Sequence, residues 1–345
     1  MLLDTASFVL EASPDYPYHI TSKRYTNPNL NNVDDTAITL VLTHATGMHK
    51  ECWDLVMQHL FELCSTPGSM VKIRDAWTID CINHGEAAVM NEDILLTHFN
   101  EQFGWDNYGR AVGRFLTAGE ERGARIDFSK RNLHALGHSM GAVSLVWLQR
   151  ELSIFKSLTL IEPMISPPGF DLRGGAASSW IKASYQRRDV WPSKSAASKD
   201  LLSNKGYKSW DPAMIELFVQ YALRPHPASN FALQPYKGVV LSCTRFQEAA
   251  CYRTDSGFAE AMAGALVPIS REVPVHLIWG EIKDAISQPI QEALGDESQS
   301  NIRAASSRSI PGVGHLAVQA SPPGVAKAVL EALAVENAKG ISSRL

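Results

Sequence analysis

The sequence predicts an α/β fold with a mostly parallel central sheet and one helical insertion. Apolar strand-like runs alternate with helical segments in residues 1–165 and again in residues 268–345. Such alternation is typical of a parallel sheet that is covered by helices on both faces. Between these ranges the alternation stops, and Pro, Gly, Trp and basic residues surround short helical fragments. We therefore expect a core of residues 1–165 and 268–345, interrupted by a helical lid of residues 166–267.

The first part of the core contains strands and helices in alternation. Residues Ala37–Thr43 form a continuous apolar run rich in β-branched side chains, which is typical of a strand buried on both faces. In Lys50–Cys64 the apolar residues recur at helical spacing. Further strands are predicted at Val71–Cys81, Asn132–Gly137 and Ser157–Ile161, and further helices at Asn107–Glu121 and Ala142–Leu152.

The insertion and the second part of the core give weaker patterns. Within the insertion, helical fragments are predicted at Trp180–Arg188 and Pro212–Leu223. The alternation then resumes with a strand at Val273–Trp279, a helix at Ser287–Leu294, a weak strand at Ile302–Ile310 and a terminal helix at Gly324–Glu336. These elements would complete the same sheet.

Composition excludes several classes of protein. The 345 residues are 45% hydrophobic and 20% charged with a net charge of −4, which argues against nucleic acid or an anionic membrane as the main partner. No stretch approaches the roughly 18 to 20 apolar residues that span a bilayer. The 5 cysteines are scattered and lack metal-ligand spacing, so we expect reduced thiols. No metal or organic cofactor is implied.

The most informative motif is Gly137-His-Ser139-Met-Gly141, which lies between a predicted strand and a predicted helix. This is the G-x-S-x-G pattern of a nucleophile elbow, in which a sharp strand-to-helix turn exposes a serine. A Cβ at either glycine would crowd that turn. The motif in this context predicts the α/β-hydrolase fold with Ser139 as the nucleophile.

The loop after the first buried strand is the second candidate site segment. In this fold that loop donates one backbone N–H to the oxyanion, and the residue after the nucleophile donates another. The expected donors are the N–H groups of Met140, Thr46, Gly47 and Met48. We interpret His44, at the strand end, as an organiser of the loop, and we expect His49 on the surface.

Candidates for the general base and the acid are found from the chain order of this fold, which is Ser, acid, His. His315 follows the last predicted strand, and two glycines in Pro311-Gly-Val-Gly-His315 would let its loop reach over the sheet. Glu162 and Asp284 each follow a predicted strand, and Glu281 is a more remote choice. Either Glu162 or Asp284 would orient the imidazole and stabilise the imidazolium, so the residues alone leave the acid open.

Three segments resemble a fungal branch of the α/β hydrolases. His44-Ala-Thr-Gly-Met-His-Lys-Glu-Cys-Trp53 is similar to the His-Ala-Asn-Gly-Phe-x-Lys-Glu segment of that branch, and Leu160-Ile-Glu-Pro163 and Arg188-Asp-Val-Trp-Pro-Ser193 are similar to two others. The branch includes hydrolases of host-selective toxin biosynthesis and the peroxisomal acyl-CoA hydrolase of mycophenolic acid biosynthesis. The resemblance covers about residues 25–322.

The resemblance implies an acid after the earlier strand, which favours Glu162, with Asp284 as the alternative. The chain departs from the branch at Thr46 and Met48, where Asn and Phe are usual, so the acyl pocket is expected to differ. The implied function is hydrolysis of an acyl thioester (acyl-CoA) or an ester of a specialised metabolite through an acyl-enzyme. An acyltransferase or cyclase, a carbon–carbon bond hydrolase and, more remotely, a non-catalytic binding module remain open.

Two further features bear on partners and location. The residues Ser343, Arg344 and Leu345 form a conservative variant of the Ser-Lys-Leu peroxisomal address, so we expect import by the peroxisomal receptor, with the cytoplasm as the alternative. The insertion could supply an acyl pocket from its aromatic residues Trp180, Trp191, Trp210, Phe218, Tyr221 and Phe231. Its basic residues, which could meet the phosphates of coenzyme A or simply face solvent, are Arg187, Arg188, Lys194, Lys199 and Lys205.

Overall fold

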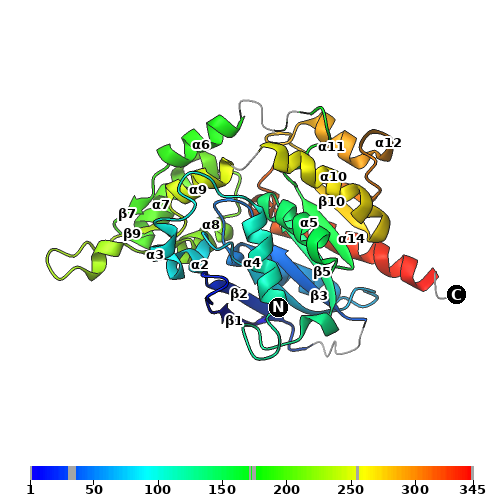
Figure 1. Ribbon diagram of the computed structural model, residues 1–345, viewed down its shortest axis with the longest axis horizontal. Coiled ribbons are helices and arrows are strands. Elements are labelled where there is room, and N and C mark those ends of the chain that lie inside the picture. The colour runs from blue at the N-terminus through cyan, green and yellow to red at the C-terminus, as the bar shows by residue number, and fades with distance from the viewer. Residues whose placement is uncertain (1, 30–35, 171, 173–175, 254–255, 343–345) are drawn as a thin grey trace.

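A computed structural model describes residues 2–29, 36–170, 172, 176–253 and 256–342. Its centre is an 8-stranded sheet (Figure 1). The strands are β1 (Asp4–Leu10), β2 (Ile20–Thr26), β3 (Ile38–Thr43), β4 (Ile73–Ile79), β5 (Asn132–His138), β6 (Ser157–Ile161), β10 (Val275–Gly280) and β11 (Ala304–Ile310). Their order is β1-β2-β4-β3-β5-β6-β10-β11, and all neighbours from β4 to β11 are parallel. This arrangement confirms the predicted fold class.

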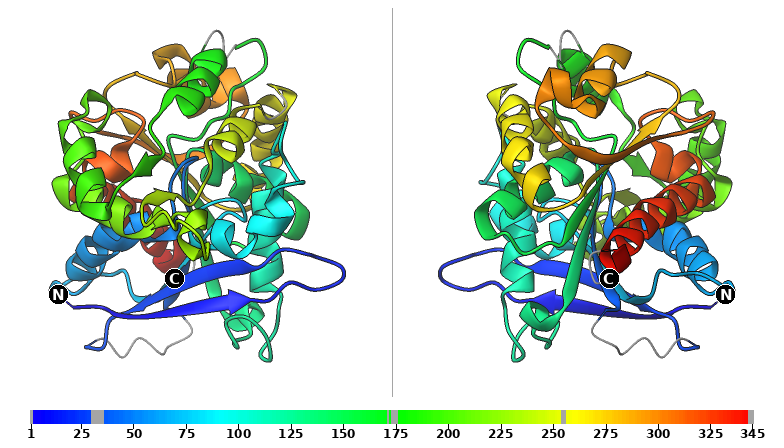
Figure 2. Two further views of the ribbon diagram at one scale, coloured as in Figure 1. Left: turned by 90° about the vertical axis from the view of Figure 1, so that its left-hand side faces the viewer. Right: turned by 90° about the vertical axis from the view of Figure 1, so that its right-hand side faces the viewer.

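Helices cover both faces of the sheet. The long helices of the core are α1 (Asp54–Cys64), α4 (Asp106–Leu116), α5 (Met140–Leu152), α10 (Ser256–Glu272) and α14 (Pro322–Ser342). Helices α4 and α10 pack against α5 on one face, and α1 packs against α14 on the other (Figure 2). Apolar side chains form one buried cluster on each side, represented by Val112 and Val143 on the first and by Leu60 and Val329 on the second. The interior is apolar because strands buried on two faces have no solvated side.

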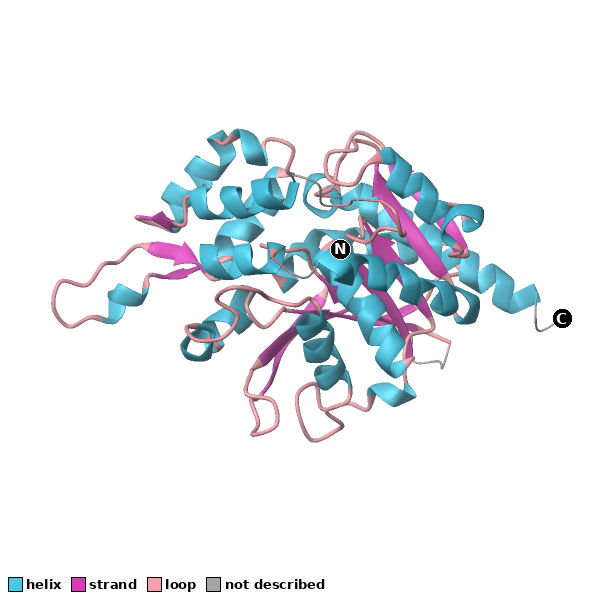
Figure 3. Cartoon of the chain, turned by 45° about the horizontal axis from the view of Figure 1, so that its top comes forward, coloured by secondary structure: helices cyan, strands magenta, loops and turns pink. Residues whose placement is uncertain are grey.

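Shorter elements complete the chain. The core also contains α2 (Gly85–Met90), α3 (Glu92–Leu95), α11 (Gln288–Gly295), α12 (Glu297–Ser300) and α13 (Ala317–Ala320). The predicted insertion contains α6 (Ala176–Gln186), β7 (Val190–Trp191), α7 (Lys194–Ser203), α8 (Pro212–Tyr221), β8 (Leu223–Pro225), β9 (Val239–Leu241) and α9 (Arg245–Tyr252). Its three strands form a separate antiparallel sheet in the order β7-β9-β8, which Figure 3 shows apart from the central strands.

The sequence patterns missed some of these elements. Neither the β1–β2 hairpin nor the small sheet of the insertion was predicted, and the first turn of the predicted helix Lys50–Cys64 is a 3-10 turn, Lys50–Trp53. Strand β2 carries Lys23, which would ordinarily disfavour burial, but its ammonium lies 2.7 Å from the carboxylate of Asp54. Helix α10 crosses the predicted boundary between lid and core at residue 267, and it packs on the core helix α5. One helix therefore contains residues assigned to the predicted lid and residues assigned to the predicted core.

Other expectations concern thiols, the membrane and the tail. All five cysteines are free and buried. Throughout the described ranges, every helix is too short or too polar to cross a membrane. The residues Ser343, Arg344 and Leu345 lie outside the described residues, so the predicted import signal stays a prediction.

Candidate active site

Ser139 lies at the turn between β5 and α5, with backbone angles φ 55° and ψ −120°. This strained conformation is the one that a nucleophile elbow requires. A Cβ at Gly137 would lie 2.5 Å from the Cα of Ala142, and a Cβ at Gly141 would lie 2.6 Å from the carbonyl oxygen of His44. Because these contacts are with backbone, both glycines are needed for the strand, the helix and the neighbouring loop to meet.

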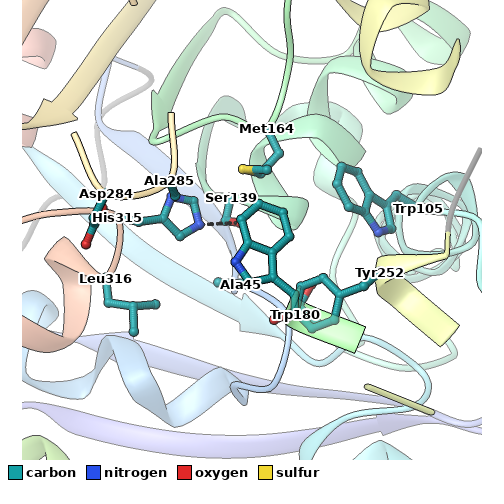
Figure 4. A pocket seen from close by; sticks show the side chains of 11 residues that line it. Ala45, Trp105, Ser139, Met164, Trp180, Tyr252, Asp284, Ala285, His315 and Leu316 are labelled. Atoms are coloured by element: carbon teal, nitrogen blue, oxygen red, sulfur yellow. Dashed lines mark hydrogen bonds between the residues drawn. The ribbon is translucent and has the colours of Figure 1, made fainter. Parts of the chain in front are cut away.

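His315 lies between Ser139 and Glu162. Its Nε2 is 2.9 Å from the Oγ of Ser139, and its Nδ1 is 3.1 Å from Oε2 of Glu162 (Figure 4 shows the first contact). The His315 side chain is 17% exposed and the Glu162 side chain only 1%. The structure therefore brings a hydroxyl, an imidazole and a buried carboxylate into one hydrogen-bonded row.

Glu162 follows β6 directly and has a positive φ of 46°. Its second oxygen, Oε1, accepts the N–H of Gly280 at 2.6 Å, so the carboxylate is held from two sides. A Cβ at Gly280 would lie 2.6 Å from the carbonyl oxygens of Val313 and Gly314. The missing side chain thus lets the His315 loop pack against the end of β10.

The two other acids that the sequence suggested bind the backbone of the His315 loop. Oδ1 of the exposed Asp284 accepts the backbone N–H of His315 at 2.7 Å, and Oε2 of Glu281 accepts the N–H of Gly312 at 2.7 Å. Neither carboxylate has a hydrogen bond to the imidazole of His315 among the described contacts. Their position is suited to fixing the loop.

His138, beside Ser139, also holds this loop. Its Nε2 lies 2.8 Å from the carbonyl oxygen of His315, and its ring is completely buried. Burial lowers the pKa of His138 to about 3, with the nearby His315 ring acting in the same direction. The ring is therefore neutral near pH 7 and donates its Nε2 proton to the carbonyl.

The predicted oxyanion donors need a correction. The N–H of Gly47 donates to Nε2 of His84 at 2.9 Å, and the N–H of Met48 donates to the carbonyl of Ala45 at 3.2 Å. Both protons are already used, so these two predictions were wrong. Within the described part of the chain, the N–H groups of Thr46 and Met140 have no acceptor, and Thr46 lines the same cavity as Ser139.

Buried neutral histidines support the Thr46 loop. His44 Nδ1–H donates to the carbonyl of Ala45 at 2.9 Å, and His44 Nε2 accepts the N–H of Cys81 at 3.1 Å. Burial lowers the pKa of His44 to about 4 and the pKa of His84 well below its ordinary value. This agrees with the interpretation of His44 as an organiser of the loop.

The end of the same loop is fixed by charges. His49, which we expected on the surface, is 1% exposed and lies 3.1 Å from a Glu51 carboxylate oxygen; the expectation was wrong because α8 covers this loop. The buried ammonium of Lys50 lies 3.0 Å from Asp80 and 2.8 Å from Glu86. Although burial opposes its charge, the carboxylates of Asp80 and Glu51 raise the pKa of Lys50.

A cavity of about 270 Å³ opens beside Ser139. In Figure 4, His315, Asp284, Ala285 and Leu316 line one side, Trp105 and Tyr252 line the other, and Met164 and Trp180 lie between the two sides in this view. Of the insertion aromatics that the sequence suggested, only Trp180 lines this cavity. Tyr252 and Trp105 were missed because each lies far along the chain from the recognisable motifs, and Met164 was missed although it directly follows the Leu160–Pro163 segment.

The basic residues of the insertion do not form one free cluster. Arg187 lies 2.6 Å from Glu248 and 2.9 Å from the hydroxyl of Tyr207, and although burial opposes its charge, Glu248 raises the pKa of Arg187. Arg188 lies 3.4 Å from Asp200, and Lys194 donates to a backbone carbonyl. The exposed Lys199 and Lys205 are the two of the five with no polar partner in the described part of the chain. A shared phosphate site on these residues is not supported.

Comparisons with known proteins identify the family of the chain. The family described as "Alpha/beta hydrolase family" matches residues 40–328. The type I acyl-CoA thioesterase mpaH of Penicillium roqueforti is 29% identical over 211 residues, which are 59% of this chain and 44% of that protein. The match thus covers less than half of that relative's length. The peroxisomal membrane protein LPX1 of Saccharomyces cerevisiae is 31% identical over 131 residues, 38% of this chain and 32% of that protein.

Solved structures show the same fold. The peroxisomal alpha-beta-hydrolase Lpx1 of Saccharomyces cerevisiae has a TM-score of 0.72 at 19% identity, covering 96% of this chain and 87% of that one. The thioesterase domain from the curacin biosynthetic pathway has a TM-score of 0.63 at 13% identity, covering 96% of this chain and 100% of that one. With a family match across most of its length and a serine at the nucleophile elbow, the chain belongs to the alpha/beta hydrolase family and is a hydrolase.

Proposed function

We propose that this hydrolase cleaves acyl thioesters, with Ser139 as the nucleophile, His315 as the general base and Glu162 as the acid. The observation that carries the proposal is the row of contacts from the Ser139 hydroxyl through the His315 imidazole to the Glu162 carboxylate, at 2.9 and 3.1 Å. Nδ1–H of His315 donates to Glu162, which leaves Nε2 free to accept the serine proton.

The reaction follows in two stages. Ser139 Oγ attacks the carbonyl carbon while its proton moves to Nε2 of His315, and the N–H groups of Thr46 and Met140 stabilise the oxyanion. Collapse of the tetrahedral intermediate breaks the carbon–sulfur bond, and the thiolate leaves and takes the proton from Nε2. Water, deprotonated by Nε2 of His315, then attacks the acyl-serine ester. Collapse of this second intermediate breaks the bond between the acyl carbon and Oγ, which takes the proton from Nε2, so the carboxylic acid is released and Ser139 is regenerated.

The names of the relatives support a thioester, rather than another acyl compound, as the substrate. The relatives include proteins named as acyl-CoA thioesterases, and the solved structures of this fold include a thioesterase domain. A thiolate is a good leaving group, so the site need not supply strong acid assistance at departure. Among the described residues that line the cavity, none is a Lys or Arg, so no cationic side chain assists departure there.

The test is a screen of acyl-CoA thioesters and matched oxygen esters. Thiol release is measured for the wild type, for Ser139→Ala and for Ser195→Ala, a control that removes an exposed hydroxyl on α7. We expect hydrolysis of at least one thioester, unchanged in the control and reduced by at least 1,000-fold in Ser139→Ala. Equal rates in Ser139→Ala and the wild type would reject the mechanism. Product formation only with an added acceptor nucleophile would indicate an acyltransferase.

We further propose that the enzyme works in the peroxisome. One relative is named a peroxisomal membrane protein, and a solved structure of the same fold is named a peroxisomal hydrolase. An amino-terminally fluorescent fusion should coincide with a peroxisomal marker, and removal of residues 343–345 should return it to the cytoplasm if the import receptor reads them. A diffuse signal from the intact fusion would contradict this location.

A further inference from the structure

The cavity has a leaving-group end and an acyl end, if the proposed thioester hydrolysis is accepted. His315 must return a proton to the departing sulfur, so the thiol leaves on the His315 side. Asp284, Ala285 and Leu316 line that side. Figure 4 shows Tyr252 on the opposite side of Ser139, with the Trp180 ring drawn between Tyr252 and His315. The acyl group therefore lies against the aromatic residues of the insertion.

This acyl end contains polar atoms that the protein does not use. Trp105 Nε1–H donates to the carbonyl of Cys251 at 2.9 Å. By contrast, the hydroxyl of Tyr252 and the indole N–H of Trp180 have no hydrogen-bond partner among the described residues, although both side chains line the cavity. The two rings lie beside each other, with centroids 5.7 Å apart.

An unpartnered donor in a mostly apolar cavity has a consequence for specificity. When an apolar substrate displaces solvent from such a group, the group loses its hydrogen bonds without replacement. A site of this kind disfavours a substrate that lacks the matching polar group. Phe at position 252 would fill the same space without that penalty, so the hydroxyl indicates a polar feature of the substrate.

The charge of that feature can also be inferred. No Lys or Arg is among the described residues that line the cavity, so an acyl group with a second carboxylate would have no counter-ion there. Burial, reinforced by the nearby Glu248 carboxylate, raises the pKa of Tyr252 well above its ordinary value, so the phenol is a neutral donor at physiological pH. A neutral acceptor is the matching partner.

We propose that the preferred acyl group is compact and carries an uncharged hydrogen-bond acceptor, such as an ether, ketone or hydroxyl oxygen, that accepts from the Tyr252 hydroxyl. The cavity of about 270 Å³ lies just below the range of roughly 300 to 1,000 Å³ usual for small-molecule sites, which agrees with a compact group. Trp180 offers a second donor and a flat apolar wall at the same end.

The experiment compares 3-phenylpropanoyl-CoA with its ortho-, meta- and para-methoxy analogues. We expect at least one methoxy isomer to exceed the parent in kcat/KM by roughly 2- to 12-fold, the net contribution of one neutral hydrogen bond. Tyr252→Phe should bring that ratio close to one. Tyr236→Phe, which removes the hydroxyl of an exposed tyrosine elsewhere in the insertion, should keep the wild-type ratio.

A second readout separates this inference from the proposed function. The N-methyl amides of the same four acids are titrated into the wild type and Tyr252→Phe, since amides should bind without turnover. If the thioesters are hydrolysed but no isomer shows a preference that depends on Tyr252, the acyl-group inference is wrong. If the amides show that preference while no thioester is cleaved, the thioesterase proposal fails and the polar acyl site stands. Absence of both effects overturns both.

Discussion

Replacement of Glu162 by glutamine should reverse the tautomer of His315. In the wild type, Oε1 of Glu162 accepts the Gly280 N–H at 2.6 Å and Oε2 faces Nδ1 of His315 at 3.1 Å. A glutamine must keep its carbonyl oxygen toward Gly280, because only an acceptor fits there. Its NH₂ group then faces Nδ1 and donates to it. The imidazole proton is therefore held on Nε2, directed at Ser139 Oγ only 2.9 Å away, and the base cannot accept the serine proton.

The expected loss in kcat is about 10⁴-fold, by analogy with the Asp-to-Asn change of the serine protease triad, which leaves the geometry intact and gives the wrong tautomer. At about 1.36 kcal/mol per tenfold change, this is a rise of roughly 5 kcal/mol in the activation free energy. The assay is thiol release from a saturating acyl-CoA, with the melting temperature recorded to show that the variant is folded.

Asp284→Asn is the matched control, since it also replaces a carboxylate by an amide in contact with His315. An asparagine Oδ1 can still accept the backbone N–H of His315, so we expect kcat to fall less than tenfold. The reasoning is refuted if Glu162→Gln stays within tenfold of the wild type while Asp284→Asn loses more than a thousandfold. In that case Asp284 would be the triad acid.

Three further predictions concern the surroundings of the site. Gly141→Ala places a Cβ 2.6 Å from the carbonyl of His44 and displaces the oxyanion loop, so kcat should fall about 100-fold, and a normal kcat would contradict the tight fit. His84→Phe leaves the N–H of Gly47 unpaired and should lower the free energy of unfolding in urea by about 1 to 3 kcal/mol, whereas an unchanged value would remove His84 from the loop support. The third concerns pH. Burial lowers the pKa of His44 to about 4, the pKa of His138 to about 3 and the pKa of His84 well below its ordinary value. In the unfolded chain these rings bind protons below about pH 6.5, whereas in the folded protein they stay neutral. Stability should therefore fall as pH drops below about 6.5, and a flat profile from pH 7.5 to 5 would contradict the exclusion of these protons by the fold.

The fold and two side chains of the Ser139–His315–Glu162 row, those of Ser139 and His315, could be predicted because the constraints on them are local. The elbow around Ser139 needs glycines at fixed positions between a strand and a helix, and the His315 loop needs small residues after the last strand. The acid could not be fixed in this way. Glu162 and Asp284 both follow strands that reach the same edge of the sheet, and only the packing of the His315 loop decides which carboxylate meets the ring.

Longer-range contacts explain what the sequence could not show. The N–H of Gly47 is used by His84, which lies 37 positions away, so no pattern around the loop reveals that it is unavailable. Strand β2 is mostly polar in sequence, and the burial of its Lys23 depends on an ion pair with Asp54. Tyr252 joins the cavity through the packing of α9, and nothing in its neighbouring residues distinguishes it from other aromatic residues of the insertion.

Covalent labelling of Ser139 tests the central claim most directly. The wild type is treated with a fluorophosphonate, which reacts with activated serines, and the adduct is located by intact mass and peptide mapping. We expect a single adduct on Ser139, slower labelling in the presence of a substrate acyl-CoA and greatly slowed labelling in Glu162→Gln. Labelling at another residue, or an unlabelled Ser139 in a protein that still releases thiol from acyl-CoA, would contradict the assignment of Ser139 as the nucleophile.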